Sequence, residues 1–289
     1  MFDHIAFPIP YQTLALSSSV QLTIKRLDLI HPQISGNKFF KLKYNLLAAQ
    51  QQGLSQVLTF GGAFSNHIAA TAYAAQRFGF QSIGIIRGEE LATQDLNPTL
   101  QTAQDFGMQL HFVSRAEYRL RHEVEYLQQL QQQYSQAFII PEGGTNALAL
   151  QGTQEILSEN DRKNYDVICC AVGTGGTIAG LIESSSNQQQ IVGFSALKGN
   201  FLQHDIQQWT TKTNWRLTDA YCCGGYAKIT DELLQFMQQF EQQYTIPLEQ
   251  VYTAKMMMGL FDLIQQNHFP ANTRILAIHT GGLQGRFKM

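Results

Sequence analysis

The alternation of short apolar segments with longer amphipathic ones is the feature that most limits the fold of this chain. Apolar runs such as "SQVLTF", "SIGIIR" and "RILAIH" predict strands, and the stretches between such runs have helical spacing. Strands that are apolar along their whole length are typical of parallel sheets covered by helices on both faces. The sequence therefore predicts an α/β protein built on open parallel sheets.

The predicted elements cover most of the chain. Strands are expected at 20–29, 55–60, 82–87, 109–113, 137–141, 165–172, 190–196 and 274–279, and helices at 38–52, 68–78, 116–134, 230–244 and 254–266, with another opened by Asn97-Pro98. Because 289 residues are many for one compact unit, we expect two domains. Turn-rich joints near Tyr44 and at 141–146 predict a large domain of residues 1–43 and 144–289 and a small inserted α/β domain of residues 44–143.

Charge and hydropathy favour a small-molecule ligand. With 20 basic and 22 acidic residues the formal net charge is −2, which offers no electrostatic footprint for nucleic acid or an anionic membrane. The start of the chain lacks a signal-peptide pattern, and no window approaches the roughly 18 apolar residues of a membrane span. We therefore expect a cytoplasmic protein with neither nucleic acid nor membrane as a partner.

The four cysteines form two adjacent pairs, Cys169-Cys170 and Cys222-Cys223. This spacing differs from that of metal knuckles and redox motifs, so no metal site is predicted. Buried reduced thiols are expected. The alternative that the two cysteine pairs lie close together in the folded protein stays open.

Three glycine turns follow predicted strands. The first, "AVGTGGTIAG" (171–180), also opens a helix, so its backbone amides can converge on an anion. It is neither a Walker loop, since no Gly-Lys-Ser/Thr follows, nor a dinucleotide fingerprint, since Ile178 takes the place of the last glycine. The phosphate of a mononucleotide-sized ligand fits better, and a turn needed only for close packing is the alternative.

The second turn, "TFGGAFSNHIAATA" (59–72), brings Ser65, Asn66 and His67 to a helix start, and the third is "HTGGLQG" (279–285). Ser65 or Asn66 either caps the helix or helps to bind a substrate carboxylate with the helix amides. Ligands of open α/β sheets gather at the carboxyl ends of strands, which all three turns follow.

The segment "ISGNKFFKLKY" (34–44) contains three lysines within six positions. A lysine near a phosphate cradle and a carboxylate site suggests a Schiff base with pyridoxal phosphate, and Lys38 is the candidate. Positive charge from Lys41 and Lys43 would help it to lose its proton. Ordinary solvated lysines are the alternative.

Together these motifs resemble the tryptophan-synthase-β type (fold type II) of pyridoxal phosphate enzymes. Within that type the chain is similar to the 1-aminocyclopropane-1-carboxylate deaminase and D-cysteine desulfhydrase family. The similarity runs nearly end to end, through "IKRLDL", "SGNKFFKLKY", "GGAFSNHIAATAYAAQRFG", "PEGGTNALALQG", "AVGTGGTIAGL", "VYTAKMMMGLFDLI" and "HTGG".

The resemblance implies a role for each matching residue. Lys38 would be the Schiff-base lysine, Asn66 would bond the ring hydroxyl of the cofactor, and Ser65, Asn66 and His67 would line the substrate side. The phosphate loop would consist of Gly173, Thr174, Gly175, Gly176 and Thr177.

Four further positions follow from the same resemblance. Tyr252 and Tyr226 match two active-site tyrosines, although the surroundings of Tyr226 are altered to Ala227-Lys228, and Thr280 would face the pyridine nitrogen. Thr253 in "VYTAK" stands where the deaminases carry a glutamate facing that nitrogen. Threonine implies a weaker electron sink, which favours β-elimination over opening of a cyclopropane ring.

The activity implied is D-cysteine desulfhydration, which gives pyruvate, ammonia and sulfide, in a homodimer that acts on a small amino acid. Deamination of 1-aminocyclopropane-1-carboxylate is the nearest alternative. A pyridoxal phosphate carrier without turnover, a racemase and a lyase for serine-like substrates also stay open. Phe39-Phe40 and Ala254 depart from the family pattern and bear on the substrate.

Overall fold

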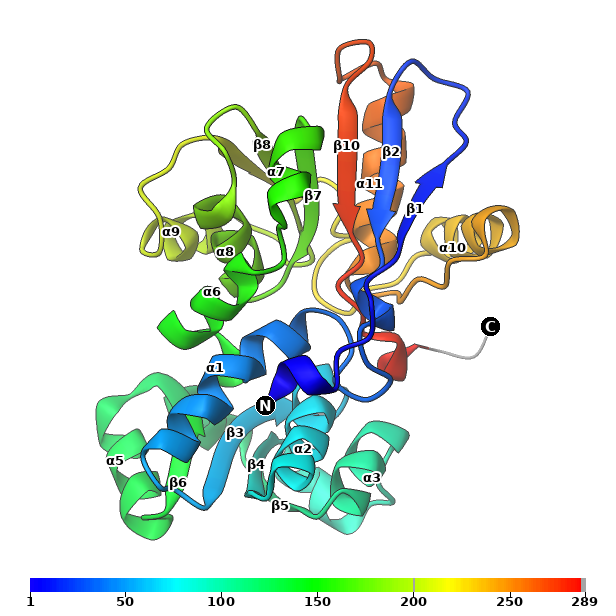
Figure 1. Cartoon of the computed structure of the whole chain (residues 1–289). Coiled ribbons are helices and arrows are strands. Elements are labelled where there is room, and N and C mark those ends of the chain that lie inside the picture. The colour runs from blue at the N-terminus through cyan, green and yellow to red at the C-terminus, as the bar shows by residue number, and fades with distance from the viewer. Residues whose placement is uncertain (200, 287–289) are drawn as a thin grey trace. The chain divides into compact units, whose positions relative to one another are not determined.

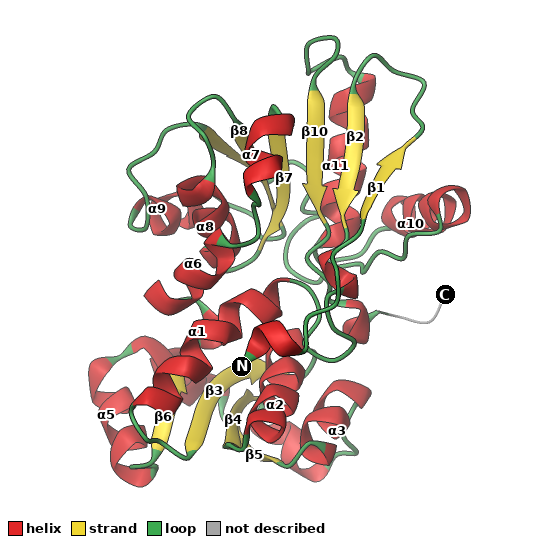
Figure 2. Ribbon diagram, in the orientation of Figure 1, coloured by secondary structure: helices red, strands yellow, loops and turns green. Residues whose placement is uncertain are grey.

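The chain forms two compact units, each with one sheet and its own helices (Figure 2). The structure, a computed structural model, describes residues 1–199 and 201–286. Unit 1 consists of residues 1–6, 31–34 and 38–152, and unit 2 of residues 7–30, 35–37 and 153–289. These units are defined by contacts within the folded chain and not by independent folding, so the domain boundaries expected from the sequence stay a prediction.

Unit 2 contains a six-stranded sheet in the order β1-β2-β10-β7-β8-β9. Its strands are β1 (Tyr11–Leu14), β2 (Gln21–Lys25), β7 (Val167–Val172), β8 (Gln190–Ser195), β9 (Trp215–Thr218) and β10 (Arg274–Ile278). Its helices are η2 (Leu27–Leu29), α7 (Glu159–Asn164), α8 (Gly176–Ser184), α9 (Phe201–Gln207), α10 (Asp231–Tyr244), α11 (Thr253–Gln265) and η6 (Leu283–Gly285). All neighbouring strands run parallel except β1, which pairs with β2 in the antiparallel sense.

The two faces of the unit 2 sheet bury different side chains, as the period of two along a strand requires. Val192 and Phe194 of β8 belong to the core cluster that packs against α10 and α11. Gly193, between them, points toward Ile178 of α8, because a β-carbon there would lie 2.5 Å from Cδ1 of Ile178. This sheet is therefore covered on both faces. All four cysteines are free, and Cys223 alone among them is only half-buried.

Unit 1 contains a four-stranded parallel sheet in the order β5-β4-β3-β6. Its strands are β3 (Gln56–Gly62), β4 (Gln81–Arg87), β5 (Met108–Val113) and β6 (Ala137–Ile140). Its helices are η1 (Phe2–His4), α2 (Asn66–Phe78), η3 (Glu89–Thr93), α3 (Pro98–Asp105), α4 (Arg115–Arg119), η4 (Leu120–His122), α5 (Val124–Gln133) and η5 (Glu142–Gly144). Helices α1 (Asn37–Gln51) and α6 (Ala147–Gln154) cross the division between the units.

Helices cover both faces of the unit 1 sheet, α5 on one face and α2 and α3 on the other (Figure 1). Ile85 packs with Tyr126 and Leu130 of α5, and Ile86 packs with residues of α2 and α3. Consecutive residues of β4 thus point to different helical layers. Both units are parallel-sheet α/β structures, which confirms the predicted fold class.

The single helix predicted over 116–134 is wrong, because the structure breaks it into α4, η4 and α5. The guanidinium group of Arg121 donates to the Tyr118 carbonyl at 3.1 Å and pairs with Glu142 at 2.6 Å. Glu123 then adopts extended backbone angles and starts α5 in a new direction. The helical spacing is continuous across this point, so periodicity alone does not reveal the break.

The cap of α3 offers a test of local stability. The side-chain oxygen of Asn97 accepts from the N–H groups of Thr99 and Leu100 at 2.9 and 3.0 Å, and its amide donates to the Ala63 carbonyl at 3.0 Å. We expect Asn97→Ala to lower the free energy of unfolding by about 1–2 kcal/mol, measured by urea denaturation. Asn97→Asp keeps the capping oxygen, so its free energy of unfolding should fall less. Equal losses in the two variants would assign the effect to the bond with Ala63 instead of the cap.

No helix within residues 1–199 and 201–286 is both long and apolar enough to cross a membrane. Over the same ranges, no three histidine, cysteine, aspartate or glutamate side chains gather as metal ligands would.

Candidate active site

The segment that precedes Lys38 is anchored within unit 2. The backbone N–H of Asn37 donates to the Thr280 carbonyl at 3.2 Å, and its side-chain amide donates to Oγ1 of Thr177 at 2.8 Å. Gly36, at φ 67°, lies so close to Thr280 that a β-carbon would be 1.9 Å from its carbonyl oxygen. Lys38 follows as the second residue of α1 and is half-buried. The backbone from which Lys38 extends is therefore fixed at Asn37.

The other two lysines of this motif have structural partners within unit 1. Lys41 is 2% exposed, and its ammonium group donates to the Gly143 carbonyl and to Oγ1 of Thr145, both at 2.9 Å. Lys43 pairs at 2.8 Å with Asp3, whose carboxylate is largely exposed. Lys41 therefore holds the turn at 143–145 in place, and Lys43 combines its ion pair with a position over the ring of Tyr44.

The loop at 173–177 joins β7 to α8 and contains three glycines, Gly173, Gly175 and Gly176. Gly175, at φ 80°, is the N-cap of α8 and has no side chain to bond the free amides of the first turn. A β-carbon on Gly173 would lie 2.9 Å from the ring of Tyr252, so this position also excludes a side chain. Uncapped amides at the positive end of a helix form a site for an anion such as phosphate.

A second turn leaves the same edge of the unit 2 sheet. Strands β7 and β10 are parallel neighbours, so the loop at 173–177 and the turn at 280–282 both follow carboxyl ends at that edge. In unit 1, β3 extends through Gly61 and Gly62, and the turn of residues 63–65 follows its carboxyl end. The three turns lie at the strand ends where the sequence predicted them, and this is where open α/β sheets bind ligands.

The start of α11 is held by a residue that the sequence did not single out. The buried carboxylate of Glu249 accepts from the N–H groups of Val251, Tyr252 and Thr253 at 2.7, 2.7 and 2.6 Å. Burial raises the pKa of Glu249, and these three donors oppose that shift. The hydroxyl of Thr253 bonds the backbone N–H and carbonyl of Glu249 at 2.9 and 3.3 Å. An acid four residues before a helix start is the signal that could have identified this cap.

Tyr226 lies on a loop that is held by a second unpredicted residue, Lys255. The ammonium group of Lys255 is buried and donates to the carbonyls of Cys222 and Gly225, both at 2.8 Å. Burial lowers the pKa of Lys255, and the neighbouring Cys223 and Cys222 oppose that shift. The ring of Tyr226 is 48% exposed and stands edge-on to that of Tyr252, at 6.2 Å between centroids. A single charged residue within the apolar run "AKMMMGL" is the sequence signal for a buried lysine that binds backbone carbonyls.

Ser65, Asn66 and His67 form the entry to α2 in unit 1. Ser65 is the N-cap and accepts from the N–H of Ile68 at 3.4 Å, which supports the structural alternative for this residue. Oδ1 of Asn66 and Nδ1 of His67 are buried and have no hydrogen-bond partner among the described residues. Two adjacent buried polar atoms without a partner at one helix entry indicate a place where a ligand completes the hydrogen bonds.

The structure brings the predicted residues together in two sets, one in each unit. Unit 1 contains Lys38, Ser65, Asn66 and His67, and unit 2 contains Gly173, Thr174, Gly175, Gly176, Thr177, Tyr226, Tyr252, Thr253 and Thr280.

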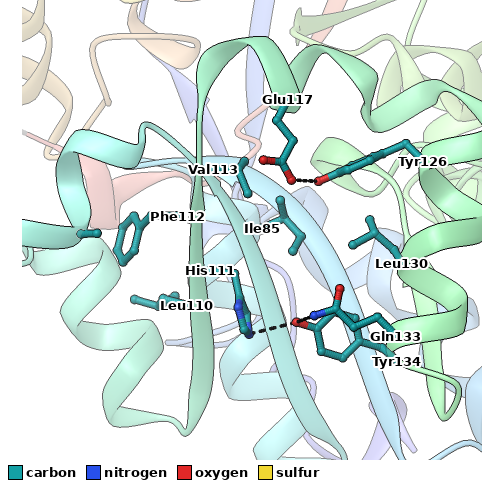
Figure 3. Close-up of a pocket in the computed structure, with 11 residues that line it drawn as sticks. Ile85, Leu110, His111, Phe112, Val113, Glu117, Tyr126, Leu130, Gln133 and Tyr134 are labelled. Atoms are coloured by element: carbon teal, nitrogen blue, oxygen red, sulfur yellow. Dashed lines mark hydrogen bonds between the residues drawn. The ribbon is translucent and has the colours of Figure 1, made fainter.

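A cavity of about 400 Å³ in unit 1 contains none of these residues (Figure 3). It lies against β5 and α5, and its polar groups already bond each other. Tyr126 donates to Glu117 at 2.8 Å, and the hydroxyl of Tyr134 lies 3.3 Å from Nε2 of His111. The residues of the predicted active site therefore do not line this cavity.

Comparison with known proteins defines the class of enzyme. A family model described as pyridoxal-phosphate dependent enzyme matches residues 6–281, so the chain belongs to that family and pyridoxal phosphate is its cofactor. The crystal structure of a homologue of 1-aminocyclopropane-1-carboxylate deaminase has a TM-score of 0.85 and 28% identity, over 97% of this chain and 91% of the other.

Two curated relatives narrow the class. A Thermotoga maritima protein, provisionally named a 1-aminocyclopropane-1-carboxylate deaminase, is 31% identical over 97% of this chain and 95% of its own length. A bifunctional D-cysteine desulfhydrase/1-aminocyclopropane-1-carboxylate deaminase of Arabidopsis thaliana is 30% identical over 98% of this chain and 78% of its own length. The predicted membership of the deaminase and desulfhydrase family is confirmed.

The residues present fit this cofactor. In unit 2, the start of α8 has no side-chain cap, which suits a phosphate. In unit 1, the buried and unpartnered Oδ1 of Asn66 suits a hydroxyl donor such as the one on the pyridine ring.

Proposed function

We propose that the chain is a lyase that eliminates the β-substituent of a small amino acid, with D-cysteine as substrate and sulfide, pyruvate and ammonia as products. The observation that carries this proposal is the presence of a threonine at position 253 and the hydrogen bonding of its side chain. Its hydroxyl is fully buried and bonds the backbone of Glu249, so this position offers no acid to a pyridine nitrogen. A weaker electron sink is adequate for loss of a thiolate after removal of the α-proton.

Bound pyridoxal phosphate supplies an electron sink for the α-carbon of the amino acid. Lys38 would hold the cofactor through its amine and, once released, take the α-proton as general base. The amides of residues 173–177 would bind the phosphate, and Asn66 the ring hydroxyl. Thr280 would lie near the pyridine nitrogen, where a hydroxyl agrees with the weak sink.

The remaining residues act on the substrate in this proposal. Ser65, Asn66 and the amides of the first turn of α2 would bind the carboxylate, since the helix N-terminus favours negative charge. Tyr226 or Tyr252 would give a proton to the leaving sulfur. The edge-on contact between the two rings, and the bond of Lys255 to the loop that carries Tyr226, support a role for this pair of tyrosines.

Deamination of 1-aminocyclopropane-1-carboxylate is the second candidate, and the names of the relatives favour it. The Thermotoga maritima protein carries that name alone, and the Arabidopsis thaliana protein carries both activities in its name. The product of this reaction is 2-oxobutanoate, which distinguishes it from desulfhydration. A cytoplasmic location and a homodimer complete the proposal, and they rest on composition and on the resemblance.

The deciding measurement is sulfide and pyruvate release from D-cysteine by the purified protein with added pyridoxal phosphate. L-cysteine and 1-aminocyclopropane-1-carboxylate serve as parallel substrates. Release that is selective for the D-form supports the proposal. A yellow protein that forms 2-oxobutanoate, and no sulfide, would replace it with the deaminase.

A further inference from the structure

His67 has an unusual hydrogen-bonding arrangement for a fully buried residue. Its Nε2 lies 2.9 Å from Oγ1 of Thr59, a residue of β3 that has no exposed surface. The same Thr59 hydroxyl donates to the Ile140 carbonyl of the neighbouring strand β6 at 2.8 Å. The ring of His67 is therefore tied to the sheet through one hydroxyl group.

The position of one proton follows from this geometry. A threonine hydroxyl carries a single hydrogen, and the Ile140 carbonyl can only accept. With that hydrogen committed to Ile140, Oγ1 of Thr59 presents a lone pair to His67, and only an Nε2–H completes the contact. Burial, followed by the charges of Lys38 and Lys41, holds the pKa of His67 well below its usual range. The ring is thus neutral, and its one proton is on Nε2.

The other ring nitrogen is consequently a bare acceptor. Nδ1 of His67 is buried, and no described residue bonds it. Gly144 lies beside it at φ 76°, where a β-carbon would come within 3.4 Å of Nδ1. Lys41 holds this glycine turn in place through the carbonyl of Gly143. The side of the ring that carries the lone pair is therefore kept free of a side chain, and buried acceptors of this kind are normally filled.

We propose that Thr59 is a positioning residue that fixes His67 as the Nε2–H tautomer, and that Nδ1 of His67 accepts a hydrogen bond from an N–H or O–H group of the substrate. The identity of the ligand as an amino acid rests on the proposed function, whereas the tautomer follows from unit 1 alone. An accepting Nδ1 binds a hydrogen-bond donor of the ligand, such as an ammonium or hydroxyl group, and does not bind a second carboxylate. A neutral acceptor beside Lys38 also avoids adding a third positive charge to Lys38 and Lys41.

The tautomer is tested by nitrogen-15 NMR of the histidine side chains in the cofactor-free protein, with His67→Gln to assign the signals. We expect the wild type and Thr59→Ser to be protonated at Nε2. Thr59→Val, which has the same shape but no hydroxyl, should shift toward the Nδ1–H form. A wild-type proton on Nδ1, or identical spectra for Thr59→Val and the wild type, would overturn the role of Thr59. If Thr59→Val does not fold, the wild type and Thr59→Ser still decide the tautomer.

The ligand contact is tested by adding D-alanine, which has no leaving group, to the protein loaded with pyridoxal phosphate. We expect the Nδ1 signal of His67 to shift, and Thr59→Val to weaken D-alanine binding about 10-fold, the effect of losing one hydrogen bond to a charged group. Thr59→Ser should restore wild-type binding. An unchanged Nδ1 signal with D-alanine bound would overturn the ligand contact. A shifted signal in a protein that releases no sulfide from D-cysteine would reject desulfhydration and keep the role of His67.

Discussion

Replacing Lys38 by alanine is expected to abolish both the yellow colour of the bound cofactor and turnover. Lys38 is the lysine of the "SGNKFFKLKY" motif that extends from the anchored residue Asn37. Loss of a general base alone costs up to about 10,000-fold, and loss of the covalent link adds to this, so we expect a rate at least ~1,000-fold below the wild type. Visible absorbance with added pyridoxal phosphate and sulfide release from D-cysteine measure the two effects.

Lys43→Ala is the matched control for this substitution. The substitution lies on the same helix and removes the same amine, which pairs with the exposed carboxylate of Asp3 and lies 5.6 Å from the centre of the Tyr44 ring. An ion pair with an exposed partner and a cation–π contact at the surface each contribute about 0–1 kcal/mol to stability, so colour and activity should persist. Thermal unfolding of both variants separates misfolding from loss of chemistry. A coloured, active Lys38→Ala protein would remove Lys38 from its proposed role.

The fold class was predictable because most strands are runs of apolar residues, which can be recognised without knowing the neighbouring strands. The run at 55–60 corresponds to β3 and that at 274–279 to β10, both buried in their sheets. Strands β1 and β9 were missed, because each has only four residues and neither contains an apolar run. The break in the helix at Glu123 was missed for a different reason, since it depends on a contact between Arg121 and a residue from another element.

The candidate site was predictable where backbone geometry demands glycine, and hidden where side chains meet across the chain. The loop at 173–177 can be identified from its glycines, because Gly173 lies close to the ring of Tyr252 and Gly175 has a left-handed backbone. The partnership of Thr59 with His67 depends on a carbonyl from β6, which no local pattern reports. Glu249 and Lys255 do leave a local signal, an acid four residues before the start of α11 and one charge within an apolar run, but their partners are visible only in the structure. Positions that require glycine are therefore easier to predict from the sequence than contacts between side chains of different elements.

Gly36→Ala is expected to lower the free energy of unfolding by about 2–5 kcal/mol. Two costs act together. The left-handed backbone at φ 67° costs an alanine about 1–2 kcal/mol, and a β-carbon 1.9 Å from the Thr280 oxygen forces one backbone segment away from the other. Since backbone atoms cannot rotate aside as a side chain does, the turn after β10 or the start of α1 must shift.

Comparison with Gly53→Ala isolates the second cost, because Gly53→Ala carries only the first. Gly53 has nearly the same backbone angle, φ 68°, and a β-carbon there would meet no heavy atom within 4 Å, so only the left-handed cost of about 1–2 kcal/mol remains. Urea denaturation of the two cofactor-free variants measures the difference. Because Asn37 bonds Thr280 directly, Gly36→Ala should also displace the backbone that carries Lys38 and weaken pyridoxal phosphate binding, whereas Gly53→Ala should not. Equal urea midpoints for the two variants would mean that the turn accommodates the β-carbon of Gly36→Ala without strain. Equal cofactor affinities would mean that the close approach of Gly36 to Thr280 does not position Lys38.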